Sequence, residues 1–462
     1  MTPLASARTP DAGRNATARR CQRWVGPSGR DGAPGTKTKP WATLERASSA
    51  VPDRHCIVWV QNGTYDGVNS IDRTFRTHTF FRAVHPYQAI LRSNGSALDI
   101  GSGAAHMTFA GFQFEQTSSG SGVLVYLSGG KHPPAPRGIT FRNDIFHDSY
   151  GDDVMKIRGG SHAITVVDNI FYNQADNEQL IDVNSVYDVT IQRNIFFEDF
   201  AASGRSDSRS TKHLIVVKDS DGNDDHRLGS SNIRIRSNVF MHYEGGPESM
   251  IAIGNDGKPY IEAKHVRIYD NLMIGDGPDP LHTTLTVNGA RDVGFFNNTV
   301  VGDQSSSSFG FEVDTKGQNP KNRNVWFSNN IWDDPTGTMG DFSSGTRSHT
   351  VGLTLDHNLY WNAGKRIKKS DLVGPGADRH HVLRNPRLNP HQSGLVLPLW
   401  NGSRFPSGLR SIHAEFLRLV RTYGRIPANS AAVRHALASI APAVDILGHR
   451  RGPRPDIGAF EI

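Results

Sequence analysis

Short stretches of alternating apolar and polar residues recur along the middle of the chain, and each ends in an asparagine. Examples are HAITVVDN, YDVTIQRN, NIRIRSN and HVRIYDN, each followed by two or three apolar residues and a polar turn. The asparagines are Asn143, Asn169, Asn194, Asn238, Asn271, Asn298, Asn330 and Asn358. Alternation with period two indicates half-buried strands, and its regular recurrence indicates an internal structural repeat.

The spacing of the asparagines indicates how the repeats are arranged. Asn169 and Asn194 are 25 residues apart, whereas Asn194 and Asn238 are 44 apart because the insertions SGRSDSRSTK and DSDGNDDHRLGSS lie between them. A unit this short buries its apolar side only against its neighbours, so equal positions must stack. Stacked strands lie about 4.8 Å apart, which allows asparagine amides to hydrogen-bond from coil to coil. We therefore predict an all-β fold, a right-handed parallel β-helix, with structural asparagines.

The ends of the chain have a different pattern. The earlier strands HCIVWVQNGTY, QAILRSN and HMTFAGFQFEQ match the repeat loosely, with Gly111 where later coils carry asparagine. PWATLERASSAV predicts a short amphipathic helix that caps the N-terminal end, and SIHAEFLRLVRTYG predicts a helix in a C-terminal cap. Such ends cover edge strands that would otherwise aggregate. The expected organisation is a flexible leader over 1–20, the β-helix over 21–410 and the cap over 411–462.

These motifs resemble a known group of proteins. The segment WVGPSGRDGAPGTKTKPWATLERA, the strand VWVQNGTY, the N-I-F coils and the terminal PDIGAFE are similar to right-handed parallel β-helix repeat proteins. That group overlaps in fold with pectate-lyase-like and alginate- or chondroitin-lyase-like enzymes. The resemblance covers roughly residues 21–462 and implies a carbohydrate-active protein. Its repeated residues are architectural, so it assigns no catalytic residue.

Composition limits the possible partners. Lys and Arg total 51 against 45 Asp and Glu, which agrees with an acidic polymer as partner but is not the footprint of a nucleic-acid-binding protein. No run of 18 apolar residues predicts a membrane span, and the 20 histidines show no zinc-binding spacing. Cys21 and Cys56 form either one disulfide or two free thiols. We expect a monomer that is secreted, periplasmic or on the cell surface, although the first 20 residues lack the apolar centre of a signal peptide.

Because the coils stack in register, the strands DDVMKIRGG, EQLIDVNSV, KHLIVVKDS, ESMIAIGND, TTLTVNGAR and FGFEVDTKG define columns of side chains. The inward column is Ile157, Val183, Val217, Ile253, Val287 and Val313. The outward columns are Lys156, Asp182, Val216, Ala252, Thr286, Glu312 and Arg158, Asn184, Lys218, Gly254, Asn288, Asp314. The strand starts add the columns Asp152, Glu178, Lys212, Glu248 and Asp153, Gln179, His213, Ser249. Charge is concentrated in the first three of these coils.

This charge pattern predicts a site for an acidic polysaccharide. A lyase acting on uronic acids needs a cation that neutralises the C6 carboxylate, a base for the C5 proton and an acid for the leaving oxygen. Lys218 and Arg158 are the first candidates for base and acid, provided that the pKa of the lysine is lowered. The further catalytic candidates are Lys156 and His213. The expected substrate-binding residues are Asn184, Lys212 and Asn288, and the expected Ca²⁺ ligands are Asp152, Asp153, Glu178 and Asp182.

Three alternatives stay open at the level of sequence. Stacked opposite charges such as Lys156 and Asp182 are also ordinary cross-strand pairs on a solvated face. The string GDDVMKI resembles the G-D-D element of polygalacturonase-type hydrolases, in which Asp152, Asp153 or Asp182 would be acid and base. The other elements of that family are missing, so a hydrolase ranks second. A non-catalytic carbohydrate-binding or adhesive solenoid is the third alternative.

Overall fold

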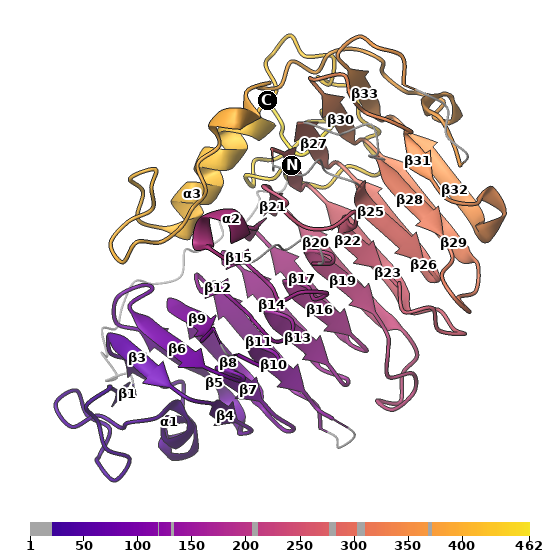
Figure 1. Cartoon of the computed structure of the whole chain (residues 1–462). Helices are drawn as coiled ribbons and strands as arrows, with labels where there is room; N and C mark the ends of the chain where they lie inside the picture. Colours follow the sequence, from indigo (N-terminus) through magenta and orange to yellow (C-terminus); the bar gives the residue numbers. More distant parts are fainter. Residues whose placement is uncertain are drawn as a thin grey trace, which may run out of the picture.

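The chain winds into coils whose strands form three parallel sheets (Figure 1). The computed structural model describes residues 21–118, 120–130, 134–205, 211–276, 283–302, 310–367 and 372–462, so the expected leader over 1–20 lies outside the described residues. Each complete coil contributes one strand to each sheet, and every strand pairs in parallel with its counterparts in adjacent coils. The fold is a right-handed parallel β-helix, as the repeat predicted.

The three sheets take their strands in turn along the chain. The 12-stranded sheet comprises β1 Gln22–Val25, β2 Ile57–Val60, β5 Thr74–Ala83, β8 Ala105–Ala110, β11 Arg137–Arg142, β14 His162–Val167, β17 Tyr187–Gln192, β20 Ser230–Arg236, β23 Ala263–Tyr269, β26 Ala290–Phe296, β29 Asn322–Ser328 and β32 Thr350–Asp356. The 11-stranded sheet comprises β3 Gly63–Asp66, β6 Ala89–Ser93, β9 Phe112–Gln116, β12 Ile145–His147, β15 Ile170–Tyr172, β18 Ile195–Phe197, β21 Val239–Phe240, β24 Leu272–Gly275, β27 Thr299–Gly302, β30 Ile331–Asp334 and β33 Leu359–Asn362. The 10-stranded sheet comprises β4 Asn69–Ile71, β7 Leu98–Ile100, β10 Val125–Ser128, β13 Met155–Arg158, β16 Ile181–Asn184, β19 Ile215–Lys218, β22 Ser249–Ile253, β25 Thr283–Asn288, β28 Phe311–Asp314 and β31 Ser343–Ser344.

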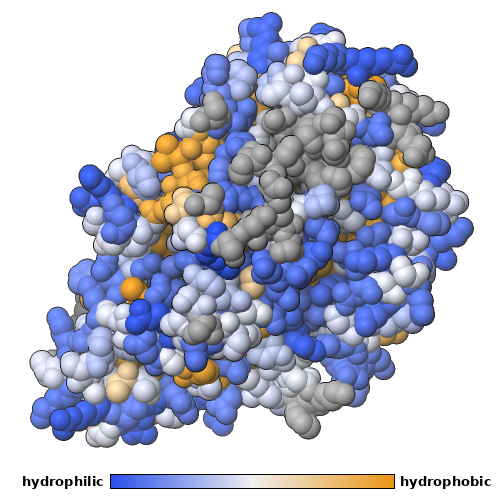
Figure 2. All heavy atoms as spheres, viewed as in Figure 1, coloured by the Kyte–Doolittle hydropathy of each residue, from blue (hydrophilic) through white to orange (hydrophobic). Residues whose placement is uncertain are grey.

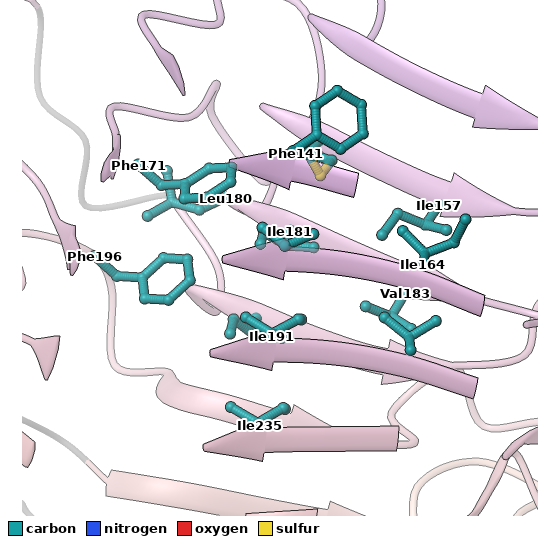
Figure 3. Close-up of a cluster of buried hydrophobic side chains, with 14 of the residues drawn as sticks. Phe141, Ile157, Ile164, Phe171, Leu180, Ile181, Val183, Ile191, Phe196 and Ile235 are labelled. Atoms are coloured by element: carbon teal, nitrogen blue, oxygen red, sulfur yellow. The ribbon is translucent and has the colours of Figure 1, made fainter. Parts of the chain in front are cut away.

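The interior of the solenoid is a continuous stack of apolar side chains (Figure 3). Phe146 lies 4.5 Å from Phe171 between ring centroids, and Phe171 lies 5.2 Å from Phe196. These separations are close to the spacing of neighbouring strands, so identical residues in successive coils stack face to face. The packed interior fixes the register in which the outward residues are presented.

An asparagine ladder runs beside this core. The Nδ2 of Asn194 donates to the Oδ1 of Asn238 at 3.1 Å, and the same contact joins Asn238 to Asn271 at 3.0 Å. The first asparagine of the predicted series was misplaced by one residue. Asp144, not Asn143, precedes the strand that aligns with β15, and its backbone N–H donates to the Oδ1 of Asn169 at 2.8 Å.

Asn143 belongs to a neighbouring column that needs left-handed backbone. Its φ is 58°, and the residue before each later ladder asparagine also has positive φ. Gly111, at φ 85°, aligns with Asn143 rather than with the ladder. Asparagine, aspartate and glycine tolerate this conformation, which explains why asparagines occupy two consecutive columns and why the sequence alone confused them.

Both predicted terminal helices are present. Helix α1, Leu44–Ala50, packs near β1 and β4 at the N-terminal end. Helix α3, Ile412–Leu419, continues into a π-helical turn, Val420–Gly424, which contacts β24 and β27. This helix therefore lies along the outer face of the 11-stranded sheet instead of covering a terminal edge strand.

Smaller elements complete the described part of the chain. They are α2 Phe200–Ser203 and three 3₁₀ turns, η1 Arg347–His349, η2 Pro375–Ala377 and η3 Gln392–Gly394. Cys21 and Cys56 are joined by a disulfide, which settles the choice that the sequence left open. No helix among the described residues is long and apolar enough to cross a membrane. The face shown in Figure 2 is largely hydrophilic, with an apolar area beside α3.

Candidate functional site

The strand register places the outward columns as the alignment predicted. Lys156 pairs with Asp182, Asp182 with Val216, and Arg158 with Asn184, which in turn pairs with Lys218. The alternate residues Ile157, Val183 and Val217 point inward and have no exposed surface. The charged residues of β13, β16 and β19 therefore meet on the outer side of the 10-stranded sheet.

Lys156 lies at the centre of a carboxylate cluster. Its Nζ is 2.8 Å from Asp153 Oδ2, 3.2 Å from Asp182 Oδ2 and 3.4 Å from Asp152 Oδ1. The side chains of Asp153 and Asp182 have no exposed surface, whereas the side chain of Asp152 is 31% exposed. Asp153 Oδ1 also accepts a hydrogen bond from the backbone N–H of Gln179 at 2.9 Å. Asp153 is thus a structural partner of the neighbouring coil as well as part of the cluster.

Lys218 extends the cluster along the sheet. Its Nζ is 3.3 Å from Asp256 Oδ1 and 3.7 Å from Asp182 Oδ2, and the side chain is 18% exposed. Asp182 consequently lies between two ammonium groups. Neither of its oxygens makes a hydrogen bond with a described residue, so these ion pairs are its principal compensation for burial.

Arg158 and Asn184 occupy the same column as Lys218. Arg158 pairs with Asp221, which lies in the long insertion after β19, and its side chain is 33% exposed. The Nδ2 of Asn184 donates to Ser220 Oγ at 2.9 Å, and its Oδ1 accepts from the backbone N–H of Ser220 at 2.8 Å. Asn184 is almost fully buried and holds the start of this insertion against the sheet. Of the three, only the two cations retain substantial exposed surface.

The remaining predicted residues lie further along the sheet. Lys212 Nζ is 3.1 Å from Glu248 Oε1. His213 is buried, with Nδ1 2.9 Å from Ser249 Oγ and Nε2 2.8 Å from the Nδ2 of Asn255. His213 lines a pocket of about 270 Å³. The polar residues lining this pocket include Glu248, Asn255, Asn288, Glu312, Asp314 and Lys316.

The orientation of the Asn255 side chain indicates which ring nitrogen of His213 carries the proton. Its Oδ1 accepts from Lys316 Nζ at 3.0 Å, which directs its amide nitrogen toward His213. Nε2 of His213 is then the acceptor, and Nδ1 carries the proton. Burial lowers the pKa of His213 to about 4, so the imidazole is neutral at pH 7.

The ion pairs set the charge states of the cluster. Burial alone lowers the pKa of Lys156, but Asp153 and Asp182 outweigh it and hold that pKa above its ordinary value. The same balance, with Asp182 and Asp256, raises the pKa of Lys218. A lysine that acts as a base needs a lowered pKa. The ion pairs raise the pKa of both lysines, so this arrangement does not meet that need. Both lysines are cations here.

The carboxylates suit calcium in chemistry and number. Asp152, Asp153 and Glu178 offer oxygens that lie within 4.8 Å of one another, and Ca²⁺ prefers such hard oxygen ligands. Burial, followed by the Asp182 charge, raises the pKa of Asp153 well above its usual value, so the cluster favours added positive charge. The buried oxygens of Asp182, which make no hydrogen bond, point to the same need. The donor set fits Ca²⁺ once Lys156 moves away from Asp152 and Asp153.

Two important partners were missed from the sequence. Asp256 pairs with Lys218, and Asp221 pairs with Arg158. Both lie in turns that follow strands, beyond the part of each coil that the alternating pattern aligns. Their position after a strand is the one indication of them. Ser220 donates to Asp256, so Ser220 and Asp256 lie in adjacent turns at the same edge of the sheet.

Comparisons with known proteins agree with the fold. No family model matches the chain, and neither does any curated protein sequence. The pectate lyase Pel9A superposes with a TM-score of 0.51 at 14% identity, covering 96% of each chain. The A-module of the Azotobacter vinelandii mannuronan C-5 epimerase AlgE6 gives 0.52 at 12% identity, covering 75% of this chain and 96% of that one. XylC in complex with xylose gives 0.51 at 9% identity, covering 96% and 98%. These similarities establish the right-handed parallel β-helix.

Proposed function

We propose that the 10-stranded sheet binds an acidic polysaccharide and cleaves it by β-elimination. The observation that carries the proposal is the column Arg158–Asn184–Lys218, whose two cations are partly exposed beside a buried carboxylate cluster. Partly exposed cations two coils apart, at about 10 Å along the stack, suit a polymer that bears carboxylates at regular intervals. The names of the pectate lyase and the mannuronan epimerase that share the fold agree with a uronic-acid polymer.

The proposed reaction assigns one role to each group. Lys218 must first leave Asp182 and Asp256 and release its own proton to solvent; as a neutral amine it removes the C5 proton, the C4–O bond breaks as the C4–C5 double bond forms, and Arg158 supplies a proton to the leaving oxygen. Lys156 and Lys212 contribute positive charge, while Asn184 and Asn288 position the chain. His213, which lines the neighbouring pocket, is a neutral alternative acceptor, although its side chain is almost fully buried. Calcium held by Asp152, Asp153, Glu178 and Asp182 would neutralise the C6 carboxylate.

The ion pairs of Lys218 make its role testable. To act as a base, the amine must give up its contacts with Asp182 and Asp256, whereas to bind a carboxylate it need only remain charged. Lys218→Arg retains the charge but removes a usable base, because arginine stays protonated in proteins. Loss of activity in this variant together with retained polymer binding supports a base, and retained activity assigns Lys218 an electrostatic role.

The activity assay distinguishes a lyase from the alternatives. The protein is incubated with alginate, pectate and chondroitin, with and without CaCl₂, while absorbance at about 232 nm and reducing ends are recorded. We expect new absorbance that Lys218→Ala abolishes while the variant stays folded at the assay temperature, although the loss of its pair with the buried Asp182 lowers the melting temperature. Lys264→Ala is the matched control, because this lysine lies on the 12-stranded sheet and donates to a backbone carbonyl. Reducing ends without absorbance would instead establish a hydrolase. Polymer binding without either product would establish a non-catalytic solenoid.

The hydrolase alternative has a geometric difficulty. Asp153 and Asp182 have no exposed surface, so neither reaches a glycosidic oxygen without opening the cluster. Asp152 is exposed but lies beside Lys156. This favours the lyase as the first proposal.

The setting in which the protein works is also a proposal. The Cys21–Cys56 disulfide is the bond expected of an oxidising compartment, which supports a secreted, periplasmic or cell-surface protein. Polysaccharides of this kind are encountered there. We propose that the protein acts as a monomer, because a single chain contains the whole cluster.

A further inference from the structure

Two histidines and an aspartate converge at the C-terminal end of the stack. His357 Nδ1 lies 2.8 Å from Asp356 Oδ1, and His380 Nδ1 lies 2.6 Å from the same oxygen. The two imidazole centroids are 4.4 Å apart. Asp356 and His357 are consecutive, but His380 is 24 residues beyond Asp356, so sequence spacing gave no indication of this cluster.

The backbone beneath the two histidines is held by one buried carboxylate. Asp378 Oδ1 accepts the backbone N–H of His357 at 3.1 Å and that of His380 at 3.0 Å. Its Oδ2 accepts both the N–H and the Nδ2 of Asn358, at 2.9 and 2.8 Å. The residue that completes the asparagine ladder therefore also fixes the chain positions of both imidazoles. A site with such support loses little entropy when it binds a ligand.

The cluster joins the final coil, formed by β32 and β33, to a short segment beyond it. Val382 bridges to Leu359 in parallel, and its N–H donates to the carbonyl of Asn358 at 2.9 Å. The segment around 378–382 thus adds a short further layer to β33. Asp356 and His357 belong to the β32–β33 coil, whereas His380 belongs to this added layer.

We propose that Asp356, His357 and His380 bind a divalent transition metal of the zinc class. Two imidazoles and one carboxylate are a common zinc-binding set, whereas calcium prefers oxygen ligands alone. All three ligand atoms lie within 4.8 Å of one another. In a tetrahedral zinc site, metal–ligand bonds of about 2.0–2.1 Å put neighbouring ligand atoms about 3.3 Å apart. The present separations from Asp356 Oδ1 are 2.6 Å to His380 and 2.8 Å to His357, so they reach that value when the His380 ring moves outward by about 0.7 Å and the His357 ring by about 0.5 Å. Water supplies the fourth ligand.

This metal would clamp the open end of the solenoid. Terminal coils have a neighbour on only one side, so they open more readily than central coils. Metal bonds from Asp356 and His357 to His380 would tie the added layer to the β32–β33 coil. This role is independent of any activity on the 10-stranded sheet.

Zinc binding by the intact protein tests the proposal. Isothermal titration with ZnCl₂, after dialysis against chelator, compares the wild type with His380→Ala and with His357→Asn. Asparagine is chosen because position 357 has φ 57°, which alanine tolerates poorly. We expect one zinc equivalent in the wild type that weakens at least tenfold in both variants, and CaCl₂ does not replace it. Hydrogen exchange over residues 356–382 should slow in zinc and be unaffected by zinc in His380→Ala.

A matched control tests whether other histidines contribute to zinc binding. His349→Ala removes an imidazole that pairs with a single carboxylate, Asp314, and it should leave the zinc equivalent unchanged. His380 is 58% exposed, so its alanine variant is expected to fold. The proposal is overturned if the wild type and His380→Ala bind zinc equally, or if hydrogen exchange at 356–382 does not respond to zinc.

Discussion

The side-chain amide of Asn194 donates to the Oδ1 of Asn238 at 3.1 Å, although 44 residues separate them in the sequence. Asn169 makes the same contact to Asn194 at 3.0 Å across 25 residues. The long insertions between the coils therefore leave the spacing of the ladder unchanged. The strands on either side of them keep the common register.

Replacing Asn238 with alanine should destabilise the whole stack. The variant leaves the buried backbone N–H of Asn194 without its acceptor and removes the two bonds that Asn238 donates. We expect a loss of about 3 kcal/mol in unfolding free energy, because a buried donor without a partner costs about 1–3 kcal/mol. Chemical denaturation measures it. Asn62→Ala, at an exposed position where the side chain makes a hydrogen bond with His85, is the control and should cost under about 1 kcal/mol. Equal effects in the two variants would contradict a structural ladder.

The sequence predicted the fold well because the ladder and the inward column repeat in every coil. The strand columns of β13, β16 and β19 were also correct, since alternation fixes which residues point outward. Asn143 was misassigned because a left-handed backbone position next to the ladder also favours asparagine. The partners Asp221 and Asp256 were missed because turns vary in length and carry no periodic signal.

Lys156 should prove essential to the stability of the cluster. Lys156→Met leaves the buried Asp153 and Asp182 with one fewer countercharge. Removing one partner of a buried ion pair costs about 3–5 kcal/mol, so the melting temperature should fall clearly. Millimolar CaCl₂ should restore part of the loss if the carboxylates bind calcium.

The control for this cluster is Lys264→Met. Lys264 donates to the carbonyl of Leu228 and lies on β23 of the 12-stranded sheet, whereas the carboxylate cluster lies on the 10-stranded sheet. Its loss should change the melting temperature little. A Lys156→Met protein as stable as the wild type would show that the carboxylates are already protonated or solvated.

Asp333 should make stability fall as pH rises. Burial, with a smaller contribution from Asp334, raises the pKa of Asp333 to about 7. The folded state binds this proton more tightly than the unfolded state does, so the stabilisation is complete below about pH 4 and is lost as pH rises through 7. Asp333→Asn should remove this dependence and gain up to about 4 kcal/mol on the wild type between pH 4 and 8. Urea denaturation at several pH values measures it. The exposed Asp341→Asn should track the wild type throughout.

Reduction of the disulfide should destabilise the N-terminal coils. Cys21 and Cys56 close a loop with a sequence separation of 35 residues, for which chain entropy predicts about 4 kcal/mol of stabilisation. Because both cysteines are buried, reduction is expected to need local opening and to be slow without denaturant. Thermal unfolding with and without reductant, compared with Cys21→Ser/Cys56→Ser, gives the measurement. An unchanged melting temperature after confirmed reduction would refute it.

The ladder also has a direction. Each amide donates one bond to the asparagine of the next coil and one to a backbone carbonyl of the coil before, and the side-chain series ends on Asp378, a carboxylate that accepts without needing an acceptor of its own. An additional coil inserted before Asp378 must therefore bring its own asparagine, but it needs no other change to the coils around it. A duplicated segment such as 169–193 meets this requirement, so the length of the molecule is a modular property. We expect a variant with one coil more to keep the same terminal acceptor.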